Sequence, residues 1–173
     1  MAAKPANKAS RPVVGVVMGS DSDLPTMRRC LERLEALGIG YEVRVISAHR
    51  TPDAAHEYAA TAIRRGLKVL IAAAGMSAAL GGVLAAKTTL PVIGVPMASG
   101  PLAGVDAALS TMQMPPGVPV ACMSIGPAGA TNAAVYAAQI LAVGDKAMAA
   151  RMKRFKADLA RKVAKKDAAV RGG

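Results

Sequence analysis

Five short apolar runs, separated by helical patterns, restrict the fold of this 173-residue chain more than any other feature. Each run is rich in Val, Ile, Leu or Ala, as a buried strand would be. The runs cover residues 13–18, 41–46, 69–73, 91–95 and 118–123. Strands that alternate with helices predict βαβ units and a parallel sheet. Because crossovers are right-handed, we predict an α/β fold in which a five-stranded parallel sheet lies between two helical layers, a three-layer αβα sandwich.

Four parts follow from this pattern and from the charges. We expect a disordered basic N-terminus (1–11), a single folded domain (12–145), a basic amphipathic C-terminal helix (146–166) and a disordered tail (167–173). One face of the predicted extra helix carries an apolar stripe made of Met148, Met152, Phe155, Leu159 and Val163. Since earlier helices already cover the sheet, we expect this stripe to pack against another subunit. Docking on its own domain is the alternative.

The net charge of +11 lies almost entirely in the two ends of the chain. Residues 1–12 carry +3 and residues 145–173 carry +7, which leaves +1 for the span between them. A nucleic-acid-binding domain usually carries its basic patch on the folded body. The distribution therefore favours solvated basic tails, and we predict no nucleic-acid partner.

Two long uncharged stretches, Val69–Ala86 and Thr88–Val105, reach the length of a membrane span. Recurring Pro and Gly favour buried strands and short helices instead, and residues 1–11 lack the apolar segment of a signal peptide. Cys30 and Cys122 have neither metal-binding nor redox spacing. We therefore predict reduced thiols, a cytoplasmic protein, no membrane contact and no metal.

Polar side chains follow the first two strands directly. The segment 19–23 reads Gly-Ser-Asp-Ser-Asp, and the segment 47–52 reads Ser-Ala-His-Arg-Thr-Pro. In an open α/β sheet, ligands bind at the carboxyl ends of the strands. His49 can move a proton near neutral pH, and Arg50 suits a phosphate. The two segments predict a site for a phosphorylated small molecule, although helix-capping turns would use similar residues.

The same motifs, with others further along the chain, resemble the PurE enzymes of purine biosynthesis. The additional matching segments are 104–106 (Gly-Val-Asp), 113–115 (Gln-Met-Pro), 128–130 (Ala-Gly-Ala) and 132–134 (Asn-Ala-Ala). The resemblance implies a flavodoxin-like, Rossmann-like core. It also implies a homo-octamer in which the C-terminal helix packs on a neighbour. Class I members convert N5-carboxyaminoimidazole ribonucleotide (N5-CAIR) to 4-carboxy-5-aminoimidazole ribonucleotide (CAIR), without metal, ATP or organic cofactor.

The resemblance also implies site residues. The catalytic histidine of the family falls on His49, which would act as general acid/base. The predicted substrate-binding residues are Ser20, Ser22, Asp23, Ser47, Arg50, Gly75 and Ser77. Carbon dioxide released during the reaction needs a dry, closed site. The Ala/Gly-rich segments 72–82 and 99–104 would form its walls.

Three positions depart from the class I pattern. Ala79 stands where class I has a loop histidine, and Pro116 and Pro127 replace family Arg and Lys. The loop over residues 75–80 leans toward class II, whose members carboxylate aminoimidazole ribonucleotide (AIR) directly with CO2. Residues 47–52 have the class I form. The sequence favours the mutase; the direct carboxylase and a nucleotide-binding scaffold without catalysis remain as alternatives.

Overall fold

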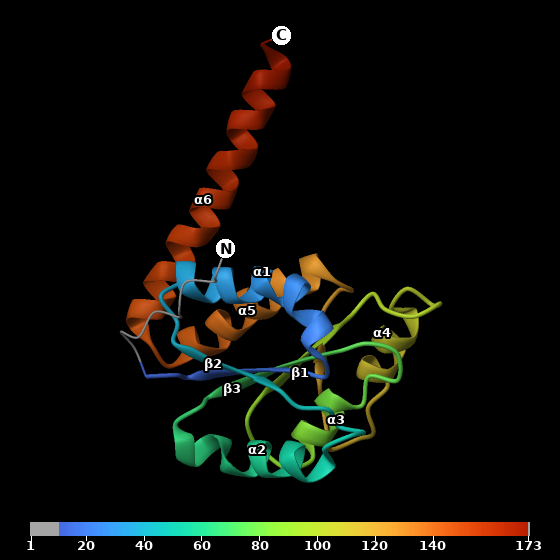
Figure 1. Cartoon of the computed structure of the whole chain (residues 1–173). Helices are drawn as coiled ribbons and strands as arrows, with labels where there is room; N and C mark the ends of the chain where they lie inside the picture. The colour runs from blue at the N-terminus through green and yellow to red at the C-terminus, as the bar shows by residue number, and fades with distance from the viewer. Residues whose placement is uncertain (1–10, 173) are drawn as a thin grey trace, which may run out of the picture. The chain divides into compact units, whose positions relative to one another are not determined.

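The computed structural model describes residues 11–172, and the chain divides into two compact units, one up to Ala137 and one from Ala138. The first unit contains a five-stranded sheet in the order β2-β1-β3-β4-β5, with every neighbouring pair parallel (Figure 1). This is the flavodoxin-like order. The strands are β1 (Val14–Met18), β2 (Tyr41–Val45), β3 (Val69–Ala74), β4 (Val92–Pro96) and β5 (Ala121–Cys122). The predicted parallel sheet is confirmed, although β5 is shorter than expected.

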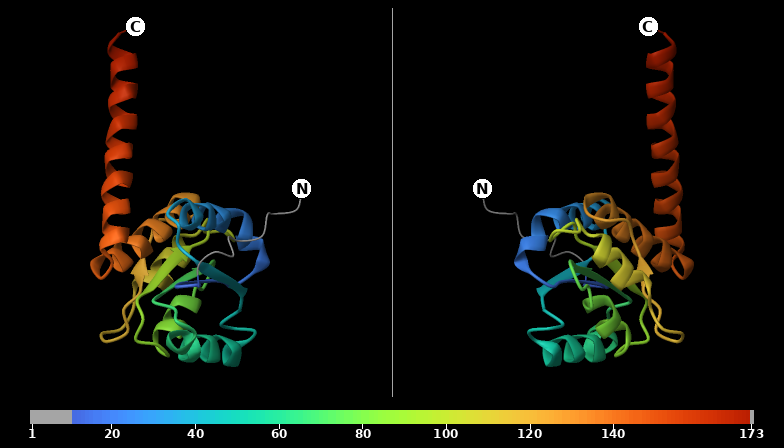
Figure 2. Two further views of the ribbon diagram at one scale, coloured as in Figure 1. Left: turned by 90° about the vertical axis from the view of Figure 1, so that its left-hand side faces the viewer. Right: turned by 90° about the vertical axis from the view of Figure 1, so that its right-hand side faces the viewer.

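Helices cover both faces of this sheet (Figures 1 and 2). They are α1 (Leu24–Ala36), α2 (Pro52–Arg65), α3 (Leu80–Ala85), α4 (Val105–Met112) and α5 (Pro127–Val143), and a 3-10 turn, η1 (Asp21–Asp23), precedes α1. Alternate strand residues face opposite layers. Val17, Leu70 and Ala72 belong to the core cluster that includes residues of α2 and α3. The buried positions of α1 are Met27, Cys30 and Leu34, so Cys30 is a core thiol.

Glycines inside two strands let large side chains approach the sheet. A Cβ on Gly15 would overlap the hydroxyl of Tyr58, and one on Gly94 would overlap Cγ2 of Thr111. Thr111 is buried in α4 and donates its hydroxyl to the Ala107 carbonyl at 2.7 Å. The two contacts bring α2 and α4 close to the sheet, where an alanine would hold them away.

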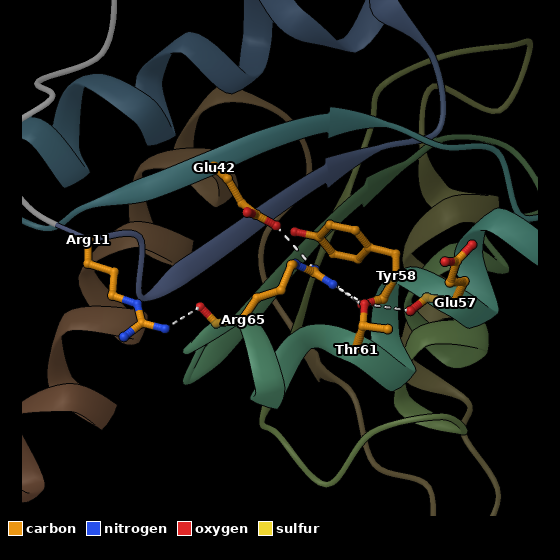
Figure 3. Close-up of polar contacts among 6 residues, drawn as sticks. All are labelled: Arg11, Glu42, Glu57, Tyr58, Thr61 and Arg65. Atoms are coloured by element: carbon orange, nitrogen blue, oxygen red, sulfur yellow. Dashed lines mark hydrogen bonds and ion pairs between the residues drawn. The ribbon is translucent and has the colours of Figure 1, made fainter.

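A polar cluster joins α2 to the edge strand β2 (Figure 3). Arg65 forms an ion pair with Glu42 of β2 at 3.1 Å, and its guanidinium lies 4.4 Å from the centre of the Tyr58 ring. The same guanidinium donates to the Tyr58 carbonyl at 3.2 Å and contacts the Thr61 hydroxyl. Burial, with Glu42 nearby, raises the pKa of the Tyr58 phenol, which stays neutral. This cluster anchors the helix that carries the segment 47–51 at its start.

The second unit consists of the end of α5 and the long helix α6 (Lys146–Arg171). The Asp145 carboxylate caps α6 by accepting hydrogen bonds from the Ala147 and Met148 amides at 2.8 and 3.0 Å. Met148 and Met152 are buried, whereas Leu159 is 42% exposed and Val163 67% exposed. The predicted apolar stripe is therefore buried only at its beginning within this chain.

The C-terminal helix is longer than the sequence predicted. The helix expected to end at residue 166 continues to Arg171, so most of the tail predicted to be disordered is helical. Residues 167–171 contain two alanines and an arginine, which favour helix, and no Gly or Pro. The N-terminal segment predicted to be disordered lies outside the described residues, apart from Arg11.

We expect Gly94→Ala to destabilise the protein by about 1–3 kcal/mol, because the new methyl group overpacks the space filled by Thr111. Thr111→Ser removes Cγ2 and keeps the hydroxyl, so it should recover part of this loss when combined with Gly94→Ala. Urea unfolding of the single and double variants measures the effect. Gly144→Ala, with no neighbour within 4 Å of the new Cβ, is the matched control. Equal losses with Thr and Ser at position 111 would show that the contact is unimportant.

Candidate functional site

A pocket of about 450 Å³ lies at the carboxyl edge of the sheet. The loops after β1, β2, β3 and β4 all contribute to it, as expected for parallel strands. All eight residues predicted from the sequence line this pocket: Ser20, Ser22, Asp23, Ser47, His49, Arg50, Gly75 and Ser77. The structure therefore brings together residues that are up to 57 positions apart, since Ser20 and Ser77 line the same pocket.

The loop after β1 holds its serine hydroxyls in a small network. Ser20 Oγ accepts hydrogen bonds from the Ser22 amide at 3.3 Å and from the Ser22 hydroxyl at 2.8 Å. Ser20 in turn donates to the Asp21 carboxylate at 3.3 Å. Ser20 thus caps η1, whereas Asp23 occupies the N-cap position of α1 and makes no capping hydrogen bond. The Asp23 carboxylate is left to face the pocket.

Arg50 ties the loops after β1 and β2 together. Its Nη2 donates to the Gly19 carbonyl at 3.0 Å, and its Nε donates to Ser47 Oγ at 3.3 Å. Ser47 Oγ also accepts the Arg50 amide at 3.2 Å. A guanidinium has five N–H groups, so donors remain for a ligand. The arginine is therefore positioned before any anion arrives.

Thr51 occupies the N-cap position of α2 but makes no capping hydrogen bond. Its hydroxyl donates instead to the Ser47 carbonyl at 2.9 Å and accepts the Ser47 amide at 3.1 Å. These bonds close the tight turn that displays His49 and Arg50. His49 is exposed and makes no hydrogen bond within residues 11–172.

Asp23 is the only acidic side chain that is buried in the described part of the chain. Burial raises the pKa of its carboxyl, and the nearby Asp21 raises it further, while a hydrogen bond from the Ser20 backbone opposes the change. A carboxylate kept partly out of water accepts hydroxyl hydrogen bonds strongly. This environment suits a ligand that carries hydroxyl groups.

Seven further residues line the pocket. Among them, Met76 and Ser99 were predicted only as parts of the Ala/Gly-rich walls, with no individual role. Ser99 follows β4 at the same edge of the sheet, so its position was available as a signal; the segment 99–104 was interpreted only as an apolar wall. Met76 has a left-handed backbone (φ 55°), which its sequence position does not reveal.

No group of three or more His, Cys, Asp or Glu side chains in residues 11–172 is placed to hold a metal ion. No helix in the same range has the length and apolar content that crossing a membrane requires.

Comparison with known proteins identifies the family. The family model described as AIR carboxylase matches residues 13–162. The chain belongs to the AIR carboxylase family. The N5-carboxyaminoimidazole ribonucleotide mutase of Bacillus subtilis is 56% identical over 142 residues, covering 82% of this chain and 88% of the relative. The mutase of Pyrococcus abyssi is 51% identical over 154 residues, covering 89% of this chain and 87% of the relative.

A solved structure supports the same family. The crystal structure of Treponema denticola PurE superimposes with a TM-score of 0.81 at 31% identity, covering 91% of this chain and 98% of that one. The resemblance to PurE enzymes that the sequence motifs indicated is thereby confirmed. So is the flavodoxin-like fold that the resemblance implied.

We expect Asp23→Asn to raise the stability of this family member at pH 7, because the folded protein holds the carboxyl proton more tightly than the unfolded chain does. Ionisation of Asp23 therefore costs stability above its folded-state pKa. The cost disappears once the pH falls below the ordinary value of 3.8, where both states are protonated. Urea unfolding at pH 7 and near pH 3.5 measures the difference.

Glu32→Gln, at an exposed position on α1, is the control for the change in net charge. An Asp23→Asn variant that is less stable than the wild type at pH 7 would contradict this account of the buried carboxyl.

Proposed function

We propose that this chain converts N5-CAIR to CAIR in purine biosynthesis, with His49 as the general acid/base. Relatives that are 51% and 56% identical over most of the chain bear the name of this mutase. One observation carries the proposal for the residues: a titratable imidazole, an anchored arginine and a cluster of hydroxyls line a single pocket. The proposal includes no metal, ATP or organic cofactor.

Phosphate binding is assigned to Arg50 together with the hydroxyls of Ser20 and Ser22. The guanidinium is held by Gly19 and Ser47 and so loses little freedom when it binds an anion. Asp23 is assigned to the ribose, whose hydroxyls can donate to its carboxylate. Ser47 acts by fixing Arg50, and Gly75 and Ser77 form the wall on the β3 side.

The chemistry needs one proton carrier. The bond between N5 and the carboxylate carbon breaks, carbon dioxide forms, and N5 takes a proton. A new bond then joins the carbon dioxide to ring carbon C4, which loses its proton. One proton is added and one removed, so a single imidazole can serve both steps. Ala74, Ala79 and Leu80 line the pocket with apolar side chains, which limits hydration of the carbon dioxide.

A cytoplasmic homo-octamer completes the proposal. Two free cysteines, Cys30 and Cys122, fit a reducing compartment. The exposed part of the α6 stripe, Leu159 and Val163, gives a neighbouring subunit an apolar surface to cover.

Purified protein should form CAIR from N5-CAIR without ATP, and His49→Asn should lower kcat by about 100-fold or more. His56→Asn is the matched control, since His56 is exposed on α2 and does not line the pocket. CAIR formation followed by absorbance measures both. A folded His49→Asn variant with a normal rate would remove His49 from the mechanism.

The same assay separates the alternatives that involve other substrates. Efficient CAIR formation from AIR and bicarbonate, with N5-CAIR left unchanged, would identify a direct carboxylase, the activity in the family's name. Binding of CAIR with neither reaction would identify a scaffold.

Leu159→Ser combined with Val163→Ser should reduce the size of the assembly, because both side chains are exposed in the single chain. Ala157→Ser with Ala164→Ser places the same polarity on another face of α6, about 100–160° around the helix from Leu159 and Val163 at 3.6 residues per turn. Light scattering coupled to size exclusion compares the masses. If both double variants keep the mass of the wild type, the α6 stripe is not a subunit contact.

A further inference from the structure

Two loops of the pocket interlock through a pair of glycines. A Cβ on Gly75, after β3, would overlap Ser99 Oγ, and a Cβ on Gly100, after β4, would lie 3.3 Å from Met76 Cγ. Each loop thus provides a glycine where the other loop inserts a side chain. Met76 and Gly100 both have left-handed backbones, at φ 55° and 71°. The interlock fixes where the Ser99 hydroxyl lies in the pocket.

The hydroxyl of Ser99 differs from those of the serines at the other side of the pocket. Ser20 and Ser22 form a hydrogen bond with each other, and Ser20 also donates to Asp21. Ser47 accepts a hydrogen bond from Arg50. Ser99 is half-buried, yet its Oγ has no hydrogen-bond partner within residues 11–172. A half-buried hydroxyl without a partner costs free energy unless a ligand or water completes it. Its freedom therefore points to a ligand group.

The chemistry around Ser99 indicates which group. The loops after β1 and β2 supply Arg50 and most of the hydroxyls, so the phosphate belongs there. The loops after β3 and β4 lie farther along the sheet in the strand order, and their lining is mostly apolar. A ribonucleotide bound across the pocket places its base ring on this second side. Ser99 is the half-buried side-chain donor there, because Ser77 is exposed.

We propose that Ser99 donates a hydrogen bond to the carboxylate that migrates between N5 and C4. This inference rests on the proposed function and assigns a binding residue to the reacting group itself. The hydroxyl holds the carboxylate oxygen while the carbon–nitrogen bond breaks and until the bond to C4 has formed. Ala79 cannot donate from the loop after β3, so Ser99 provides this contact from the loop after β4.

Calorimetry with CAIR and AIR tests the assignment, because the two ligands differ by the carboxylate. Ser99→Ala should weaken CAIR binding by about 10-fold or more, the loss expected for a hydrogen bond to a charged group. Its affinity for AIR should stay within about 2-fold of the wild type. Ser110→Ala, which removes an exposed hydroxyl on α4 outside the pocket, is the control. Equal losses for CAIR and AIR, or no loss for either, would overturn the proposal.

A second readout follows the reaction. In turnover of N5-CAIR, Ser99→Ala should lower kcat and raise the share of AIR released per CAIR formed, because carbon dioxide escapes more often. An unchanged share of released AIR would count against the assignment even if kcat fell. Because the calorimetry needs no turnover, it still decides the role of Ser99 if the wild type proves to be a direct carboxylase or inactive.

Stability measurements separate this role from a purely structural one. Gly75→Ala should destabilise the wild type, and Ser99→Ala should recover much of that loss, since the Ser99 Cβ would lie 3.1 Å from the new methyl group. The double variant should regain stability but not its affinity for CAIR. Recovery of both properties would show that Ser99 serves only to pack against Gly75.

Discussion

All five strands run parallel, and the site depends on this constraint. Parallel strands send every following loop to the same edge of the sheet, so four loops that are distant in sequence meet at one pocket. Parallel sheets are also buried on both faces, which explains why β1, β3 and β4 read as continuous apolar runs. The interiors of β1, β3 and β4 leave no room for polar side chains, so the polar residues of the pocket lie in the loops that follow the strands.

Missing side chains shape the molecule as much as those that are present. Gly15 accepts Tyr58, Gly94 accepts Thr111 and Gly75 accepts Ser99, in each case because a Cβ would overlap the neighbour. A chain with one Phe and no Trp fills its core with small residues, so its layers approach closely. Glycines that make room for a neighbouring side chain thus let helices pack closely on the sheet, and in the same way they position the Ser99 hydroxyl in the pocket.

The basic C-terminal helix α6 differs from the sheet unit in being largely exposed. From residue 156 onward, α6 is exposed along its whole length. The two acidic residues of this helix, Asp158 and Asp167, form ion pairs with Arg161 and Arg171. Exposed pairs of this kind contribute little stability. Alanine and lysine keep the segment helical, while Leu159 and Val163 offer an apolar surface for a neighbouring subunit.

The succession of strands and helices along the chain, the parallel sheet and the family could all be predicted from the amino-acid sequence. The spacing of apolar residues and the motifs at strand ends are local signals, so they can be recognised without the structure. The sequence also identified eight residues that line one pocket, since motifs at strand ends converge in any sheet of this kind. Only the tertiary structure decided that Arg50 is held by Gly19, that Asp23 is buried, and that Ser99 occupies the space beside Gly75. These facts depend on distances between loops far apart in the chain, which no local pattern encodes.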